Sequence, residues 1–290
     1  MSLVLSETAS FLQDQTQRFA REKTPTSHFR SVRDSENPEC FDREIWKQMA
    51  EQGLSGILIP EEYGGSNFGL SGIGVVLQEL GRTLTPSPLF ATAVLGASLI
   101  SKLGTDEQKK KYLPEIANGN LTCCFAFEEG PRHNPKISEV TAEKKGEKFL
   151  INGKKCFVVD GCFADLIIIA AKSSKGTSLF LAQKDSKGIE VKEAKMVDSR
   201  NSANILFTGL EINSENVLGE IDNAQDTIEE VLDIARAAIS AEMLGGALEA
   251  FEITVNYLKE REQFGVKIGS FQALQHRAAN MFTLSLIHIS

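Results

Sequence analysis

A long amphipathic pattern near the end of this 290-residue chain constrains its fold more than any other feature. Apolar residues recur at close to helical spacing between residues 228 and 258, which predicts one unusually long helix. Gly265 follows, and glycine often ends a helix because it accepts left-handed backbone. Ser270 is a suitable N-cap for a second helix. The pattern therefore predicts Arg261 at the end of one helix and Gln272 at the start of the next.

The stretch between these two helices contains groups that suit a phosphate and a flat ring. A guanidinium on rigid backbone binds phosphate through two parallel hydrogen bonds, and a nearby Phe covers a ring. Judged on the residues alone, a helical hairpin with solvated charges is the simpler interpretation. However, Arg261-Glu-Gln-Phe-Gly-x-x-Ile-Gly-x-Phe-Gln272 resembles the signature of the acyl-CoA dehydrogenase family. The resemblance implies that Arg261, Phe264 and Gln272 bind FAD, with the arginine on the pyrophosphate of a neighbouring subunit.

The composition limits the class of protein. Hydrophobic residues make up 42% of the chain and charged residues 24%, which is typical of soluble globular domains. The net charge of −8 argues against nucleic acid as a partner. No run of about 18 apolar residues predicts a membrane span, and the first residues lack the pattern of a signal peptide.

The cysteines indicate a reducing compartment. The five cysteines form no CxxC pair, and only four histidines are present. We therefore expect free thiols, no metal site and a cytoplasmic location.

The change in periodicity along the chain predicts an α+β multidomain protein. We expect an N-terminal helical domain over residues 1–119, with a first helix ending near Lys23–Pro25 and a second over Asp42–Glu51. A middle β-barrel is expected over residues 120–222, and the first part of a C-terminal helical bundle over residues 223–283. The stretches Pro60–Gly65, Glu79–Arg82 and Gly104–Lys109 are similar to the family's N-terminal domain, where they are mainly structural.

Short β-branched and aromatic segments predict the strands of the middle domain. Residues 141–153 are expected to form a strand, a turn at Lys145-Gly146, a second strand and a turn at Asn152-Gly153. Residues 166–171 and 178–182 predict two further strands. The resemblance places flavin-ring contacts in this domain.

Two stretches of the middle domain match positions where family members contact the flavin ring. These positions are Phe125, Phe127, Phe157 and Val159. Glu128 and Val159 replace two threonines whose hydroxyls bond the ring in the family, and Phe157 replaces a tryptophan. The alternative is that these aromatic residues belong to the barrel core.

Asp233 and Arg236 match a family Asp and Arg that line the substrate pocket. Their three-residue offset places them on one helix face, so an intrahelical ion pair is the alternative. Arg132 and His133 could meet a phosphate of coenzyme A, but a solvated loop is the preferred interpretation.

No catalytic residue is assigned. In most family members the basic glutamate lies in the C-terminal bundle, which we expect to continue beyond the end of this chain. A minority place it where this chain has Ala235, and nothing gives Glu242 a catalytic role. Residues 284–290 are interpreted as a translated sequencing adapter, with a natural helix end as the alternative.

The resemblance implies a flavin-dependent acyl-CoA dehydrogenase. Such an enzyme removes the α-proton of an acyl-CoA thioester while the β-hydride passes to FAD, and it reduces an electron-transfer flavoprotein or a similar acceptor. We expect a homo- or hetero-oligomer, with residues 1–283 inactive alone. Two alternatives remain: an FAD-poor subunit of a heteromeric dehydrogenase, and a non-redox acyl-CoA-binding protein of the same fold.

Overall fold

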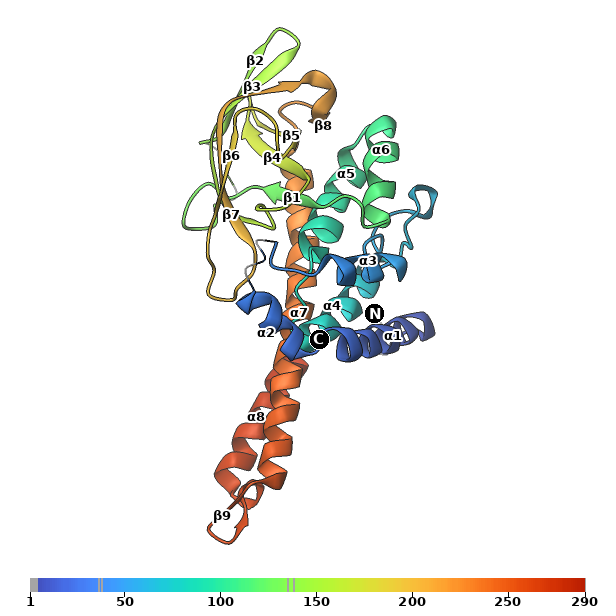
Figure 1. The fold of residues 1–290 in the computed structure, drawn as a ribbon, viewed down its shortest axis with the longest axis vertical. Coiled ribbons are helices and arrows are strands. Elements are labelled where there is room, and N and C mark those ends of the chain that lie inside the picture. Colours follow the sequence, from blue (N-terminus) through green and yellow to red (C-terminus); the bar gives the residue numbers. More distant parts are fainter. Residues whose placement is uncertain (1–4, 36, 38, 135, 138, 290) are drawn as a thin grey trace. The chain divides into compact units, whose positions relative to one another are not determined.

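The computed structural model describes residues 5–35, 37, 39–134, 136–137 and 139–289 (Figure 1). It divides into two units, described separately below. Unit 1 comprises Met1–Arg30, Ser71–Thr85 and Ala237–Ser290, and unit 2 comprises Ser31–Leu70 and Pro86–Arg236. Helices dominate both ends of the chain and a sheet occupies its middle, so the α+β prediction is confirmed. Among the described residues, no helix is long and apolar enough to cross a membrane.

Unit 1 is helical. It contains α1 (Glu7–Lys23), most of α4 (Gly69–Thr83), the C-terminal part of α7 (Gln225–Glu260) and α8 (Gln272–Ile289). The Ser6 hydroxyl accepts a hydrogen bond from the Ala9 amide at 3.1 Å and caps α1, which ends at Lys23 as predicted. The long helix predicted near the C-terminus is confirmed as α7, with 36 residues. It lies beside α8 (Figure 1), where the rings of Phe251 and Phe282 are 5.9 Å apart.

Two glycines allow α4 and α7 to touch along their backbones. A Cβ atom on Gly245 would lie 1.8 Å from the carbonyl oxygen of Gln78, and one on Gly81 would lie 2.2 Å from that of Glu242. No real side chain fits such gaps. The helix contact therefore requires glycine at both positions.

A partly buried polar network connects the same two helices and joins α4 to α1. Arg82 contacts Glu249 at 3.2 Å and Glu252 at 3.0 Å across the helix pair. Glu79 is almost completely buried and accepts hydrogen bonds from Gln13 at 2.8 Å and from Gln17 of α1. A buried carboxylate without partners would destabilise the fold, and these donors satisfy Glu79. The Glu79–Arg82 stretch therefore has a structural role, because it connects α4 to α1 and α7.

The connection between α7 and α8 differs from the prediction. It is a small β-hairpin, β9 (Glu262–Gln263) and β10 (Val266–Lys267), followed by the 3-10 turn η4 (Ile268–Ser270). Phe264 and Gly265 form its two-residue turn with φ of 55° and 80°, a type I′ arrangement. The Gly265 prediction was wrong, because its left-handed backbone serves the hairpin rather than a helix end.

Ser270 does not cap α8, which corrects a second prediction. It lies inside the η4 turn, two residues before α8, and its hydroxyl donates to the Lys267 carbonyl at 2.7 Å. The helix nevertheless begins at Gln272, as predicted.

Unit 2 combines short helices with the sheet. Its helical segments are the end of α2 (Thr26–Asp34), α3 (Arg43–Glu51), η1 (Glu61–Tyr63), η2 (Phe90–Gly96), α5 (Ala97–Leu103), α6 (Asp106–Ala117), η3 (Ser214–Asn216) and the N-terminal part of α7. Asp42 caps α3, confirming the second predicted helix. The sequence analysis did not predict α2, which contains no fully buried residue.

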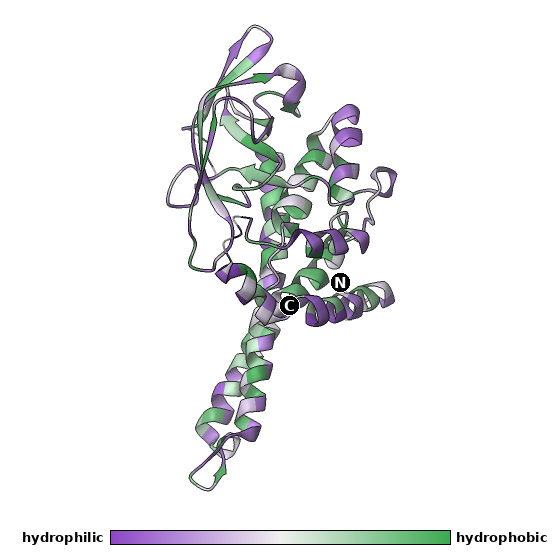
Figure 2. Cartoon of the chain, viewed as in Figure 1, coloured by the Kyte–Doolittle hydropathy of each residue, from purple (hydrophilic) through white to green (hydrophobic). Residues whose placement is uncertain are grey.

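The sheet follows the order β6-β7-β3-β2-β4-β5-β8, with β1 paired to β4. Its strands are β1 (Cys123–Ala126), β2 (Thr141–Lys145), β3 (Lys148–Val159), β4 (Leu166–Lys172), β5 (Thr177–Gln183), β6 (Ile189–Glu193), β7 (Ser202–Asn213) and β8 (Val217–Leu218). The segments predicted over 166–171 and 178–182 are confirmed as β4 and β5. Both strands are largely hydrophobic (Figure 2) and contribute to one buried core with residues such as Ile151, Ile169, Phe180 and Ile205.

The predicted turn at Asn152-Gly153 is absent. Strand β3 continues through these residues, and its register against β7 shifts between Ile151 and Gly153, as in a β-bulge. Gly153 has φ of 130°, and the Asn152 side chain accepts the Gly209 amide of β7 at 2.7 Å. An Asn-Gly pair suits both a turn and a bulge, and pairing with β7 favours the bulge. The hairpin at Lys145-Gly146 is confirmed.

Adjacent glycines of α7 provide a matched test of its contact with α4. Gly245→Ala is expected to lower the free energy of unfolding by about 1–3 kcal/mol, because the new methyl group forces the helices apart. Gly246→Ala, whose Cβ would lie 3.6 Å from the nearest atom, is expected to raise it by about 0.5–1 kcal/mol through helix propensity. Chemical denaturation measures both. Equal effects of the two substitutions would contradict the proposed backbone contact.

Candidate functional site

A fully buried lysine joins β1 to β3 where the predicted ring contacts lie. The Lys155 ammonium donates to the Phe127 carbonyl at 2.8 Å and to the Glu129 carboxylate at 3.0 Å. Burial lowers the pKa of Lys155 to about 8, against the opposing effect of Glu129. The lysine is therefore still charged at neutral pH and pairs with Glu129.

Glu129 extends this connection to the start of β2. Its carboxylate accepts the backbone amides of Glu139 and Val140, each at 2.9 Å. Nearby, the Cys156 amide of β3 donates to the Glu128 carbonyl at 2.7 Å. These bonds fix residues 127–129, which follow β1, against residues 155 and 156 of β3.

The predicted aromatic contacts differ in exposure. Phe125 of β1 and Phe127, which directly follows β1, are buried, with ring centroids 5.4 Å apart. Phe157 is 43% exposed and has φ of 51°, an unusual backbone for an aromatic residue. Val159 is half-buried two residues later. Of the four positions, Phe157 presents the most accessible ring.

Glu128 and His133 form a pair that the sequence did not reveal. Glu128 Oε1 lies 2.5 Å from His133 Nδ1, and the imidazole ring lies 6.2 Å from the Phe127 ring. Glu128 Oε2 is buried without a hydrogen-bond partner among the described residues. His133 is thus partnered rather than simply solvated. The pairing gives the Glu128 carboxylate a hydrogen-bonding partner on the loop that follows it.

Asp160 is a second buried ionisable group beside these positions. It follows Val159 directly, has φ of 60° and is 7% exposed. Burial raises the pKa of Asp160 to about 7, although nearby Arg200 opposes the shift. The sequence signal for Asp160 and Lys155 was weak, because each is charged and their burial depends on distant strands.

The predicted phosphate contacts lie together in unit 1. Within the described residues, the exposed Arg261 side chain forms no hydrogen bond or ion pair. Phe264 is 92% exposed at the hairpin tip, and its ring centroid lies 6.2 Å from that of Phe271. Gln272 is exposed at the start of α8. The connection from the end of α7 to the start of α8 therefore presents a guanidinium, an aromatic ring and a carboxamide to an outside ligand.

Asp233 and Arg236 pair with each other on α7. Arg236 Nη1 lies 2.5 Å from Asp233 Oδ1, and Glu229 is 3.9 Å away from the same guanidinium. Both side chains are exposed. The intrahelical ion pair considered as the alternative is present, and a role in substrate binding stays a prediction.

Three family models match consecutive parts of the chain. They describe the acyl-CoA dehydrogenase N-terminal domain over residues 6–120, its middle domain over residues 124–210 and its C-terminal domain over residues 226–284. The chain belongs to the acyl-CoA dehydrogenase family. The resemblance carried by Arg261–Gln272 is thereby confirmed, whereas the roles of individual site residues stay predictions.

Relatives of established identity support the same family. The 3-(aryl)acrylate reductase of Clostridium sporogenes is 31% identical over 84% of this chain and 67% of its own length. Isovaleryl-CoA dehydrogenase of Pongo abelii is 30% identical over 95% of this chain and 66% of its own length. The chain thus spans about two thirds of the length of these relatives. Acyl-CoA dehydrogenase from Geobacillus kaustophilus superimposes with a TM-score of 0.88 at 27% identity, covering 98% of this chain and 77% of that structure.

Within the described ranges, no group of three or more His, Cys, Asp or Glu side chains could hold a metal ion. The cysteines are free thiols, and Cys123 and Cys124 are buried.

The raised pKa of Asp160 predicts that the free energy of unfolding depends on pH. Its pKa is about 7 when folded and about 4 when unfolded, so the folded protein binds a proton more tightly. The free energy of unfolding should fall by about 3–4 kcal/mol between pH 4 and pH 7 because of this group. Asp160→Asn, which keeps a residue that tolerates left-handed backbone, should remove that fall.

Denaturation curves across this pH range measure the effect, with Asp185→Asn as a control because Asp185 is exposed. Parallel pH profiles for the natural protein and Asp160→Asn would contradict the burial argument.

Proposed function

We propose that this protein is a flavin-dependent acyl-CoA dehydrogenase, which removes the α-proton and β-hydride of an acyl-CoA thioester. The hairpin with Arg261, Phe264 and Gln272 carries the proposal. All three side chains are exposed, and none of the described residues bonds the guanidinium. Such an arrangement suits the pyrophosphate and a flat ring of FAD from a neighbouring subunit.

The residues at the ring end fit a flavin in part. Phe157 offers an exposed aromatic face, and the Glu128 carboxylate has a hydrogen-bonding partner in His133. Val159 has no side-chain donor, and Glu128 lacks a hydroxyl. Two lost hydrogen bonds of about 0.5–1.5 kcal/mol each weaken the binding of the ring without preventing it.

The roles of the chain in this reaction concern binding and positioning. FAD, when bound, supplies the hydride acceptor. Arg261 and Gln272 would hold its phosphates, Phe157 would cover its ring, and Asp233 with Arg236 would contact the acyl-CoA substrate. An electron-transfer flavoprotein or a similar protein is the proposed acceptor. No catalytic base is assigned to a residue of this chain, and a cytoplasmic location is proposed.

Exposed apolar side chains in unit 1 support an oligomer. Met243, Ile253 and Tyr257 of α7 are 69%, 61% and 56% exposed, and Phe264 is 92% exposed. Large apolar residues grouped on helices usually face other helices or subunits. A homo- or hetero-oligomer would cover them.

The second candidate is an FAD-poor subunit of a heteromeric dehydrogenase. It is favoured by the contrast between the accessible phosphate-binding groups and the lost ring hydrogen bonds at Glu128 and Val159. In that arrangement Arg261 would hold an FAD whose ring lies in a different chain. A non-redox acyl-CoA-binding protein is the remaining alternative.

Flavin content separates these candidates. The protein expressed from its complete coding sequence is expected to purify with FAD, measured by its visible absorbance. A colourless protein that becomes yellow only when co-expressed with a neighbouring dehydrogenase gene would favour the heteromeric candidate. Absence of FAD in both preparations, with acyl-CoA binding retained, would favour the non-redox alternative.

Arg261 should dominate FAD affinity in either enzymatic arrangement. Arg261→Ala is expected to weaken FAD binding by roughly 10- to 150-fold, because a charge-assisted contact is worth about 1.5–3 kcal/mol. Lys259→Ala is the matched control, since Lys259 is an exposed cation of the same helix end. Fluorescence titration with FAD measures both variants. Equal losses would indicate general charge attraction and argue against a specific phosphate contact.

A further inference from the structure

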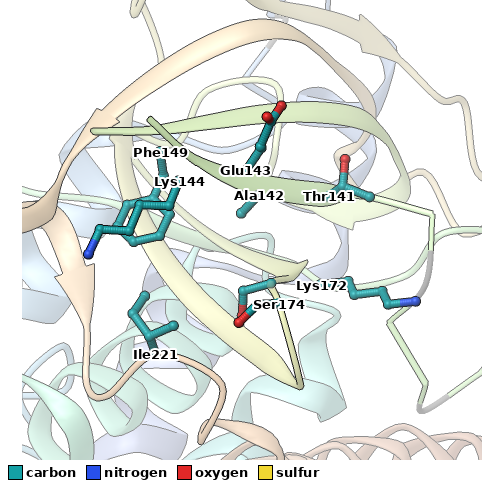
Figure 3. A pocket seen from close by; sticks show the side chains of 9 residues that line it. Thr141, Ala142, Glu143, Lys144, Phe149, Lys172, Ser174 and Ile221 are labelled. Carbon is teal, nitrogen blue, oxygen red and sulfur yellow. The ribbon is translucent and has the colours of Figure 1, made fainter. Parts of the chain in front are cut away.

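A cavity of about 380 Å³ opens beside strand β2 in unit 2 (Figure 3). Four β2 residues, 141–144, form one wall, and Phe149 of β3 lies next to them. The end of β4 with Ser173 and Ser174, together with Ile221, forms the opposite wall. None of these residues belongs to the proposed flavin or acyl-CoA contacts.

The cavity lies where β2 separates from β4. Strand β2 pairs with β3 over its whole length, from Thr141 to Lys145. With β4 it shares a single registered pair, Thr141 and Lys172. Beyond Thr141 this second edge of β2 has no strand partner in the described part of the chain. A short strand edge is therefore open toward the cavity.

The alternation of backbone groups identifies the open positions. The Val140 carbonyl accepts the Lys172 amide at 2.8 Å, so Val140 directs its backbone groups toward β4. Successive residues of a strand direct these groups to opposite edges. Glu143 therefore bonds β3, and Lys144 directs its N–H and C=O to the open edge. An incoming strand would find a donor and an acceptor there.

The lining of the cavity suits a bound segment in which an apolar side chain lies between acidic residues. Phe149 and Ala142 are buried beneath it, and Ile221 is 37% exposed at its rim. Lys144 and Lys172 direct their ammonium groups outward at its two sides (Figure 3), and neither forms an ion pair within the described ranges. Glu143, the one carboxylate of the lining, is paired with Lys145 at 3.6 Å. The net charge of the lining is therefore positive.

The opposite wall is held rigidly. Asp222 accepts the amides of Lys175 and Gly176 at 3.0 and 2.9 Å and the Ser174 hydroxyl at 2.8 Å. The Ser173 hydroxyl also donates to Asp222, and this bond, together with the other three, keeps the pKa of Asp222 well below its usual range. They also fix the turn between β4 and β5, so the cavity does not depend on a loosely held loop.

We infer that the open edge of β2 binds an extended, acidic segment of a partner protein by strand addition. An apolar side chain of that segment would enter the cavity, and acidic residues on either side would meet Lys144 and Lys172. Main-chain hydrogen bonds supply affinity in such complexes, and the pocket with its charges supplies specificity. A second copy of this chain is disfavoured as the occupant, because Lys144 and Lys145 would face their own counterparts. The inference does not depend on flavin binding.

Peptide binding to the complete protein tests this surface. The probe is a fluorescent peptide, Asp-Val-Thr-Val-Thr-Val-Asp, with blocked ends. The control peptide has Lys in place of both Asp residues. The acidic peptide is expected to bind saturably in fluorescence anisotropy, at least tenfold more tightly than the control, and to weaken as salt is added.

Variants at one position separate backbone pairing from charge. Lys144→Pro removes the N–H at the open edge and leaves the pairing with β3, because proline is accepted at such edge positions. It is expected to weaken binding at least tenfold, whereas Lys144→Gln should cause a smaller loss. Lys192→Gln of β6, an exposed strand lysine outside the cavity, should leave binding unchanged. Circular dichroism confirms folding of each variant.

Hydrogen exchange locates the contact directly. The Lys144 amide should exchange rapidly in the free protein and slow at least tenfold when the acidic peptide is bound. The Glu143 amide, already bonded to β3, should change little. The inference is overturned if the acidic peptide does not bind saturably, if the lysine peptide binds equally well, or if folded Lys144→Pro binds as the natural protein does. Protection that appears elsewhere and spares Lys144 would also overturn it.

Discussion

The buried contact between Lys155 and Glu129 is the interaction on which the middle domain's candidate site depends. Removing a lysine from water is costly, and the lowered pKa of Lys155 reflects that cost. The cost is offset because the ammonium bonds both a carbonyl and a carboxylate, and the carboxylate also accepts two amides. Three chain segments thereby meet at one buried charge pair. A hydrophobic pair could fill the same space, but it would not fix the direction of the backbone around Glu128.

Patterns with local causes were predictable from the sequence. The helices α1, α3 and α7 and the strands β4 and β5 were predicted because their apolar spacing matches the faces they bury. The errors occurred where one residue type serves two structures. Gly265 suits a helix end and a hairpin turn alike, and Asn152-Gly153 suits a turn and a bulge alike. Only pairing with another strand decides between them, and that pairing is not encoded in the local pattern.

The candidate site was predictable in position but not in environment. Matching to the family placed Phe125 and Phe157 at ring positions, yet one is buried and the other is 43% exposed. Glu128 was identified in the sequence only as the replacement of a family threonine, and its contact with His133 became visible in the structure. Lys155 and Asp160 were missed, because in an alternating strand a charged residue is expected to face water. Their burial follows from the strands β1 and β7 and the bonds across them.

The two ends of the proposed flavin site differ in how their geometry is produced. Arg261, Phe264 and Gln272 owe their placement to one short hairpin and the helix that follows it, so their arrangement is set by local backbone. Phe157 and Val159 depend on β3 being fastened to β1 through Lys155. The backbone at Glu128 and Val159 is fixed by hydrogen bonds that other residues form. Substitutions at these two positions can therefore change the side chain without moving the backbone. Loss of ring hydrogen bonds is therefore compatible with an intact fold, and the strength of ring binding can change separately from that of phosphate binding.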